Sequence, residues 1–218
     1  MARAFRDRVE AGRVLATKLT AYAHRPDVLV LALPRGGVPV AFEVAQALDA
    51  PLDVFIVRKL GVPGHEELAM GAIASGGGRI LNHEVLRYIS IPPEVIDEVT
   101  AREQRELERR ERSYRDDRPP PEVQGRTVIL VDDGLATGST MRAAAAALRA
   151  QHPARIIVAV PVASPEVCEE FRSEVDEIIC AMTPQPFMAV GLWYENFAQT
   201  SDEQVRELLE MAAHTVHH

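Results

Sequence analysis

The chain has 218 residues, a length at which a single hydrophobic core can organise one domain. Hydrophobic residues make up 47% of it and charged residues 26%, which excludes a disordered or fibrous chain. The formal net charge is −8, and this acidic balance disfavours sequence-independent binding to nucleic acid, which requires clustered basic side chains.

The apolar stretches have the length of strands, far below the roughly 18 residues of a membrane span. Charged residues interrupt residues 1–19, so this segment lacks the apolar run of a signal peptide. Cys168 and Cys180 form no C-x-x-C pair, and we expect them to be small core residues in a reducing compartment. We therefore expect a cytoplasmic protein that contacts no membrane.

The spacing of apolar residues predicts alternating helices and strands. In the first quarter of the chain these are an amphipathic helix over 5–22, a strand over 28–33 that enters the turn 34–37, a helix over 38–48 and a strand over 52–57. Later strands are expected over 127–131, 156–162 and 175–181, and later helices over 92–115, 138–150, 165–173 and 201–213. Such alternation predicts an α/β fold, with a parallel sheet of about five strands flanked by helices.

One segment interrupts this alternation after the second strand. Residues 59–65 are predicted to be a loop, and two short strands flank the turn Ser75-Gly76-Gly77-Gly78. Glycines of this density favour turns, so residues 59–82 are expected to form an inserted, flexible hairpin. The rest of the chain continues the same domain over residues 1–218.

The most informative stretch is residues 128–140, where a buried strand ends in Asp132 and Asp133. A Gly/Thr/Ser-rich turn then opens a helix, whose free N–H groups and dipole favour an anion. Carboxylates suit sugar hydroxyls, or a metal that bridges the ligand. A phosphate and a diol together describe a pocket for ribose 5-phosphate. The residues expected to bind the phosphate are Ala136, Thr137, Gly138, Ser139 and Thr140.

These thirteen residues resemble the 5-phosphoribosyl-1-pyrophosphate signature of type I phosphoribosyltransferases, in the variant found in adenine phosphoribosyltransferases. The order of elements agrees over residues 28–182. The resemblance implies transfer of ribose 5-phosphate from 5-phosphoribosyl-1-pyrophosphate to a nitrogenous acceptor, with release of pyrophosphate. It also implies Mg²⁺ chelated by the substrate, and direct contact of Asp132 or Asp133 with the metal is left open.

The resemblance assigns further residues to the pyrophosphate. Arg35 and Gly36 lie where the family has its pyrophosphate loop, and Arg58 and Lys59 are expected at the end of the second strand, where they would stabilise the leaving group as catalytic charges. The insertion matches the mobile catalytic loop of the family. Pro63-Gly64 would be its hinge and Gly76–Gly78 its tip.

The acceptor would lie under a hood formed by residues 183–218, which comprise an aromatic segment and the last helix. This segment loosely resembles that of hypoxanthine-guanine phosphoribosyltransferases, so Phe187 and Trp193 are candidates for contact with a heterocyclic acceptor. The alternative is that these aromatics form a small satellite core. Ala136 replaces the aspartate of 6-oxopurine enzymes, which leaves the base undetermined.

Three functions remain open at this point: an active phosphoribosyltransferase, a non-enzymatic sensor of the phosphoribosyl ligand, and a carrier that binds ribose phosphate without transfer. The absence of a basic stretch argues against the sensors that control a nucleic acid. A homodimer is left open.

Overall fold

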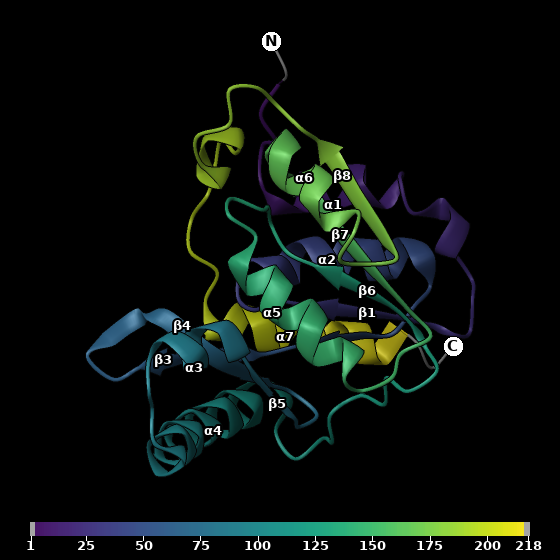
Figure 1. Cartoon of the computed structure of the whole chain (residues 1–218). Helices are drawn as coiled ribbons and strands as arrows, with labels where there is room; N and C mark the ends of the chain where they lie inside the picture. Colours follow the sequence, from purple (N-terminus) through teal and green to yellow (C-terminus); the bar gives the residue numbers. More distant parts are fainter. Residues whose placement is uncertain (1–2, 216–218) are drawn as a thin grey trace.

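The computed structural model describes residues 3–215 (Figure 1). Its central sheet is parallel and has the order β2-β1-β6-β7-β8. The strands are β1 (Val28–Ala32), β2 (Leu52–Val54), β3 (Val57–Val62), β4 (His65–Ala74), β5 (Arg79–Leu81), β6 (Thr127–Val131), β7 (Arg155–Val162) and β8 (Glu177–Met182). The helices are α1 (Arg8–Ala16), α2 (Gly37–Leu48), α3 (His83–Tyr88), α4 (Pro93–Arg115), α5 (Ser139–Arg149), α6 (Pro165–Phe171) and α7 (Asp202–Thr215), with short 3-10 turns at Thr20–Tyr22 and Val190–Trp193.

Apolar residues on both faces of the parallel strands explain the layered architecture. In β1, Val28 and Val30 pack with α1, α2 and α7, whereas Leu29 and Leu31 pack with α5 and α6. Alternate residues of a strand point to opposite faces, so a strand that is apolar throughout needs helices on both sides. The predicted fold class is confirmed.

The inserted segment differs from its prediction. It is a three-stranded antiparallel sheet in the order β3-β4-β5, and the residues 59–62, predicted to be loop, belong to β3. Pro63 and Gly64 form the tip between β3 and β4, whereas the glycine run 76–78 forms the turn into β5. Pro63 and Gly64, predicted to be the hinge, are therefore the tip of the β3–β4 hairpin. Figure 1 shows this sheet projecting beside the N-terminal end of α5.

The second strand is also shorter than predicted, because the chain leaves the parallel sheet after Val54. The Ile56 N–H donates to Ser75 Oγ at 2.9 Å, and the Ser75 N–H donates back to the Ile56 carbonyl at 2.9 Å. These bonds mark the point at which the chain leaves the parallel sheet and joins the antiparallel sheet. Arg58 and Lys59 consequently lie within β3 and not at the end of the second parallel strand.

The opening helix covers only part of the predicted range 5–22. Asp7 caps α1 by accepting a hydrogen bond from the Glu10 N–H at 2.8 Å, so the helix begins at Arg8. The residues before it pair with the C-terminal part of the chain: the Phe5 N–H donates to the Trp193 carbonyl at 2.8 Å. The residues before α1 therefore pair with the segment between β8 and α7.

Arg115 connects the end of α4 to β2 and is 2% exposed. It contacts Asp53 Oδ1 at 2.7 Å, Glu111 Oε1 at 3.0 Å and the Val54 carbonyl at 2.6 Å. We expect Arg115→Met to lower the free energy of unfolding by about 3 kcal/mol, because the partly buried Asp53 carboxylate and the buried Val54 carbonyl both lose the guanidinium. Urea denaturation measures this. Arg110→Met, which removes a more exposed partner of Glu106, is the control and should cost less than about 1 kcal/mol; equal losses would contradict the prediction.

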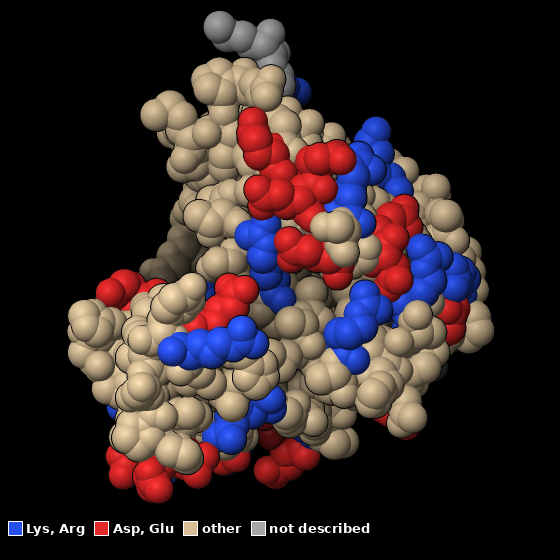
Figure 2. Space-filling model, in the orientation of Figure 1, with Lys and Arg blue, Asp and Glu red and all other residues tan. Residues whose placement is uncertain are grey.

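Within residues 3–215, no helix combines the length and the apolar character needed to cross a bilayer. Cys168 and Cys180 are free thiols that pack at the edge of the core, on the α5 and α6 side. On the face shown in Figure 2, acidic and basic side chains are interspersed.

Candidate active site

The predicted phosphate-binding turn lies at the carboxyl end of β6, between the antiparallel sheet and the segment that follows β8. Gly138 adopts φ +76° and α5 begins at the next residue, so the free N–H groups of the first turn of α5 point out of the helix. A cavity of about 190 Å³ opens here. Its lining comprises Asp132, residues 134–141 and Val190. Figure 2 shows the outline of the molecule hollowed on the same side.

The phosphate-binding turn is held in place by contacts between α5 and α6. Arg142 of α5 donates to the Thr137 carbonyl at 2.7 Å and forms ion pairs with Glu170 and Glu174. Its guanidinium carbon also lies 4.9 Å from the centre of the Phe171 ring. The turn is thus held by the α5–α6 contact.

The two adjacent acids have different surroundings. Asp132 is partly buried, and its Oδ1 accepts a hydrogen bond from the Asp133 N–H at 2.8 Å. Burial, and then the charge of Asp133, raise the pKa of Asp132 well above its usual range. Burial also raises the pKa of Asp133, but the Arg8 guanidinium opposes this shift. Asp132 lines the cavity, and Asp133 faces Arg8.

Arg58 and Lys59 point in opposite directions, as consecutive residues of a strand must. The Lys59 ammonium donates to Ser139 Oγ in the first turn of α5. Arg58 instead contacts Glu103 of α4, with Nη2 2.6 Å from Oε2. The structure therefore brings Lys59, but not the Arg58 guanidinium, to the phosphate-binding turn.

The predicted pyrophosphate loop packs directly against the acids. A Cβ atom at Gly36 would lie 2.3 Å from Asp133 Oδ2, and one at Gly37 would lie 2.8 Å from the Val131 carbonyl oxygen. Only glycine fits such an approach. The peptide bond between Pro34 and Arg35 is cis, and Arg35 Nη1 lies 3.8 Å from Asp202 at the start of α7.

The hood segment, residues 183–201 between β8 and α7, carries the predicted acceptor contacts. Phe187 and Trp193 are partly buried and pack against a small cluster that includes Phe5 and Tyr194. Neither aromatic lines the cavity at the turn, whereas Val190 does. A Cβ at Gly134 would lie 2.5 Å from Val190 Cγ1, so this valine closes tightly over the end of β6.

Sequence reasoning missed Arg8 and Tyr194. Arg8 lies 3.1 Å from Asp133 Oδ2, and the Tyr194 hydroxyl donates to the Asp133 carbonyl at 2.6 Å. Each is far from Asp133 in sequence, so no local pattern marks the contact. The pairing of Phe5 and Arg6 with the hood segment is the feature that places them.

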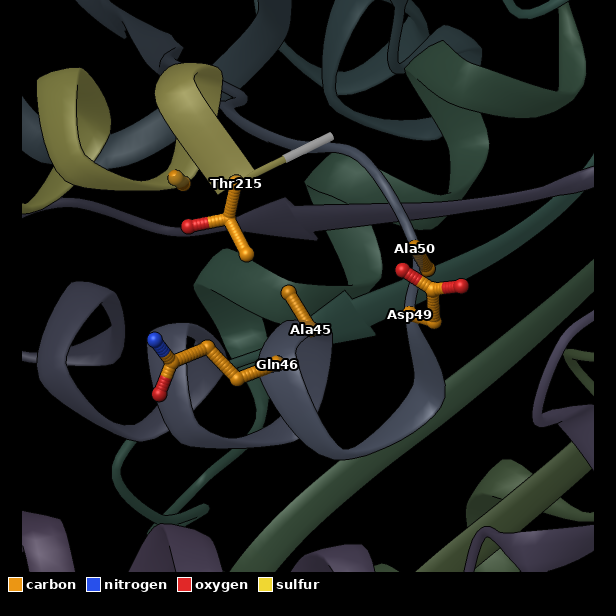
Figure 3. A pocket seen from close by; sticks show the side chains of 6 residues that line it. Ala45, Gln46, Asp49, Ala50 and Thr215 are labelled. Carbon is orange, nitrogen blue, oxygen red and sulfur yellow. The ribbon is translucent and has the colours of Figure 1, made fainter. Parts of the chain in front are cut away.

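A second pocket lies between α2 and α7 and is shown in Figure 3. It has a volume of about 20 Å³ and is lined by Ala45, Gln46, Asp49, Ala50, Ala212 and Thr215. Such a volume holds about one water molecule. It lies at the end of α2, where the chain enters β2, and so at the amino edge of the sheet. It is not a substrate site.

A parallel sheet whose loops gather a helix N-terminus, two acids and a lysine beyond its carboxyl edge is typical of α/β proteins that bind phosphorylated ligands there. Comparison with known families agrees, because the model of the phosphoribosyl transferase domain matches residues 6–184. The chain belongs to this phosphoribosyl transferase family.

Two curated relatives, from two strains of Mycobacterium tuberculosis, are each 46% identical over 208 residues, and their names assign phosphoribosyl transferase activity provisionally. The match covers 95% of this chain and 47% of each relative, so the chain spans about half their length. A crystal structure of a protein from Thermus thermophilus is 43% identical, with a TM-score of 0.84 over 95% of this chain and 98% of that one.

Proposed function

We propose that the protein transfers ribose 5-phosphate from 5-phosphoribosyl-1-pyrophosphate to a nitrogenous acceptor and releases pyrophosphate. The observation that carries the proposal is the contact between Lys59 and the first turn of α5, which joins the lysine to the phosphate-binding turn across 80 residues of sequence. The chain's membership of the phosphoribosyl transferase family further supports the proposal.

Each group then has a chemical task. The N–H groups of residues 136–140 hold the 5-phosphate at the helix N-terminus. Asp132 accepts hydrogen bonds from the ribose hydroxyls, which fixes the anomeric carbon. Lys59 and Arg35 stabilise the negative charge that grows on the departing pyrophosphate. Arg58 receives no such role here, because its guanidinium contacts Glu103 of α4 and does not reach the phosphate-binding turn.

Magnesium fits this site when it is bound through the substrate. Within residues 3–215, no group of three or more His, Cys, Asp or Glu side chains could hold a metal by itself. Mg²⁺ usually keeps several waters and binds substrate phosphates with one or two carboxylates, and Asp132 supplies one at the cavity. When bound, the ion would neutralise charge on the pyrophosphate.

The acceptor enters beside Val190, the hood residue that lines the cavity. Its apolar side chain suits the face of a flat heterocycle, and Phe187 remains a candidate for a further contact. Ala136 cannot take a proton from the acceptor. The acceptor must therefore present a nitrogen that attacks without proton transfer to that position.

The test is release of pyrophosphate from 5-phosphoribosyl-1-pyrophosphate and Mg²⁺ with a panel of purine, pyrimidine and pyridine bases. We expect release that depends on one class of acceptor. Binding of the donor without release for any base would favour a sensor or carrier, and absence of donor binding would refute the proposal.

We expect Asp132→Asn to raise the KM for the donor about tenfold, with a smaller effect on kcat. The carboxylate contacts the ribose in the ground state and the transition state alike, so its loss removes uniform binding. Steady-state kinetics with varied donor measure this. Asp176→Asn, on the loop before β8, is the control and should leave KM unchanged. A loss confined to kcat would contradict the assignment.

A further inference from the structure

Arg8 belongs to α1, an element to which the proposed reaction assigns no task. Its guanidinium nevertheless ends beside the acids that follow β6. Nε and Nη2 each lie 3.1 Å from Asp133 Oδ2, and the Arg8 side chain is 11% exposed. Both donors contact the same oxygen, so Arg8 holds the Asp133 carboxylate by Oδ2, one of its two oxygens.

The same guanidinium contacts the hood segment. Nη1 donates to the Ala198 carbonyl at 2.6 Å, and the guanidinium carbon lies 4.2 Å from the centre of the Phe197 ring. The backbone beside it is fixed as well, since the Glu195 N–H donates to the Phe5 carbonyl at 2.7 Å. Arg8 therefore joins the carboxylate to the segment that covers the acceptor side of the cavity.

The geometry also shows why an arginine stands here. A carboxylate enclosed by Gly36 and the hood segment is costly without a paired charge. A guanidinium presents several donors in a rigid plane and stacks on an aromatic ring, so it can contact Asp133, Ala198 and Phe197 together. An ammonium group has neither the plane nor the reach for all three.

We propose that Arg8 is a positioning residue for the ribose of the substrate: it holds Asp133 by Oδ2, so that Oδ1 can accept a ribose hydroxyl, and it ties this carboxylate to the hood segment. The inference rests on the proposed function. It predicts that Arg8 acts on the sugar and not on the phosphate, which is bound at the N-terminus of α5 instead.

Calorimetry of the whole chain with two probes, ribose 5-phosphate and inorganic phosphate, tests this. We expect Arg8→Met to weaken binding of ribose 5-phosphate about tenfold and to leave that of inorganic phosphate within twofold. Arg8→Lys should restore part of the loss. Arg13→Met, on the same helix but in an exposed pair with Glu43, should change neither affinity.

A double variant identifies the route of the effect. Because Arg8 acts through Asp133, Arg8→Met combined with Asp133→Asn should bind ribose 5-phosphate no more weakly than Asp133→Asn alone. Additive losses would overturn the inference, as would equal losses for the two probes, which would indicate a general disturbance of the fold. Should Arg8→Met fail to fold, Arg8→Lys decides: a partial loss of affinity for ribose 5-phosphate with unchanged affinity for inorganic phosphate would support the inference, and unchanged affinity for both probes or equal loss with both would overturn it. If the wild-type chain binds neither probe, the proposed function itself fails.

Discussion

Replacement of Lys59 by alanine is expected to lower turnover about 100- to 1000-fold, while affinity for 5-phosphoribosyl-1-pyrophosphate falls much less. The ammonium lies at the first turn of α5, where it contacts Ser139, and from there it can meet the charge that develops as the bond to pyrophosphate breaks. An interaction that strengthens only in the transition state contributes to kcat more than to substrate binding.

The chain offers a matched control, because its one other lysine, Lys18, is exposed after α1 and far from the turn in sequence. Lys18→Ala should leave both constants unchanged. Calorimetry measures the affinity for the donor, and pyrophosphate release measures turnover. A parallel loss of affinity and turnover in Lys59→Ala would show that Lys59 binds the ground state, and full activity would remove it from the reaction.

The fold class followed from local pattern, and the reasons are physical. Strand β1 is apolar at every position and β6 at every position after Thr127, which requires helices on both faces, and the turn after β6 places two acids before a helix. Such signals lie within about a dozen consecutive residues. They therefore predict the parallel sheet and the phosphate-binding turn without knowledge of distant contacts.

The features that sequence could not predict depend on contacts between distant residues. The apolar run 52–57 continues across the point where the chain leaves the parallel sheet, and only the pairing of Ile56 with Ser75 marks that point. The resemblance assigns Arg58 to the pyrophosphate, and in the structure the alternation of β3 turns its side chain toward Glu103. Arg8 shows the same limit, since 125 residues separate it from Asp133.

Replacement of Gly138 by valine is expected to weaken binding of inorganic phosphate about 10- to 100-fold. Gly138 has φ +76°, a conformation that a β-branched residue adopts only with strain. A Cβ atom there would also lie 2.7 Å from Phe171 Cε2 and 3.1 Å from Val167 Cγ1. The turn must shift away from α6, and its N–H groups move with it, so charge-assisted hydrogen bonds to the anion are lost.

Gly125→Val separates this local effect from the general cost of valine at positive φ. Gly125 has φ +72° in the turn before β6, and a Cβ there would meet nothing within 4 Å. Both variants should lower the free energy of unfolding, but only Gly138→Val should lower the affinity for phosphate in calorimetry. Because Arg142 fixes the Thr137 carbonyl, a shift at Gly138 cannot be absorbed by the residue before it. Retention of full phosphate affinity in a folded Gly138→Val protein would place the anion elsewhere and would remove the turn from the site.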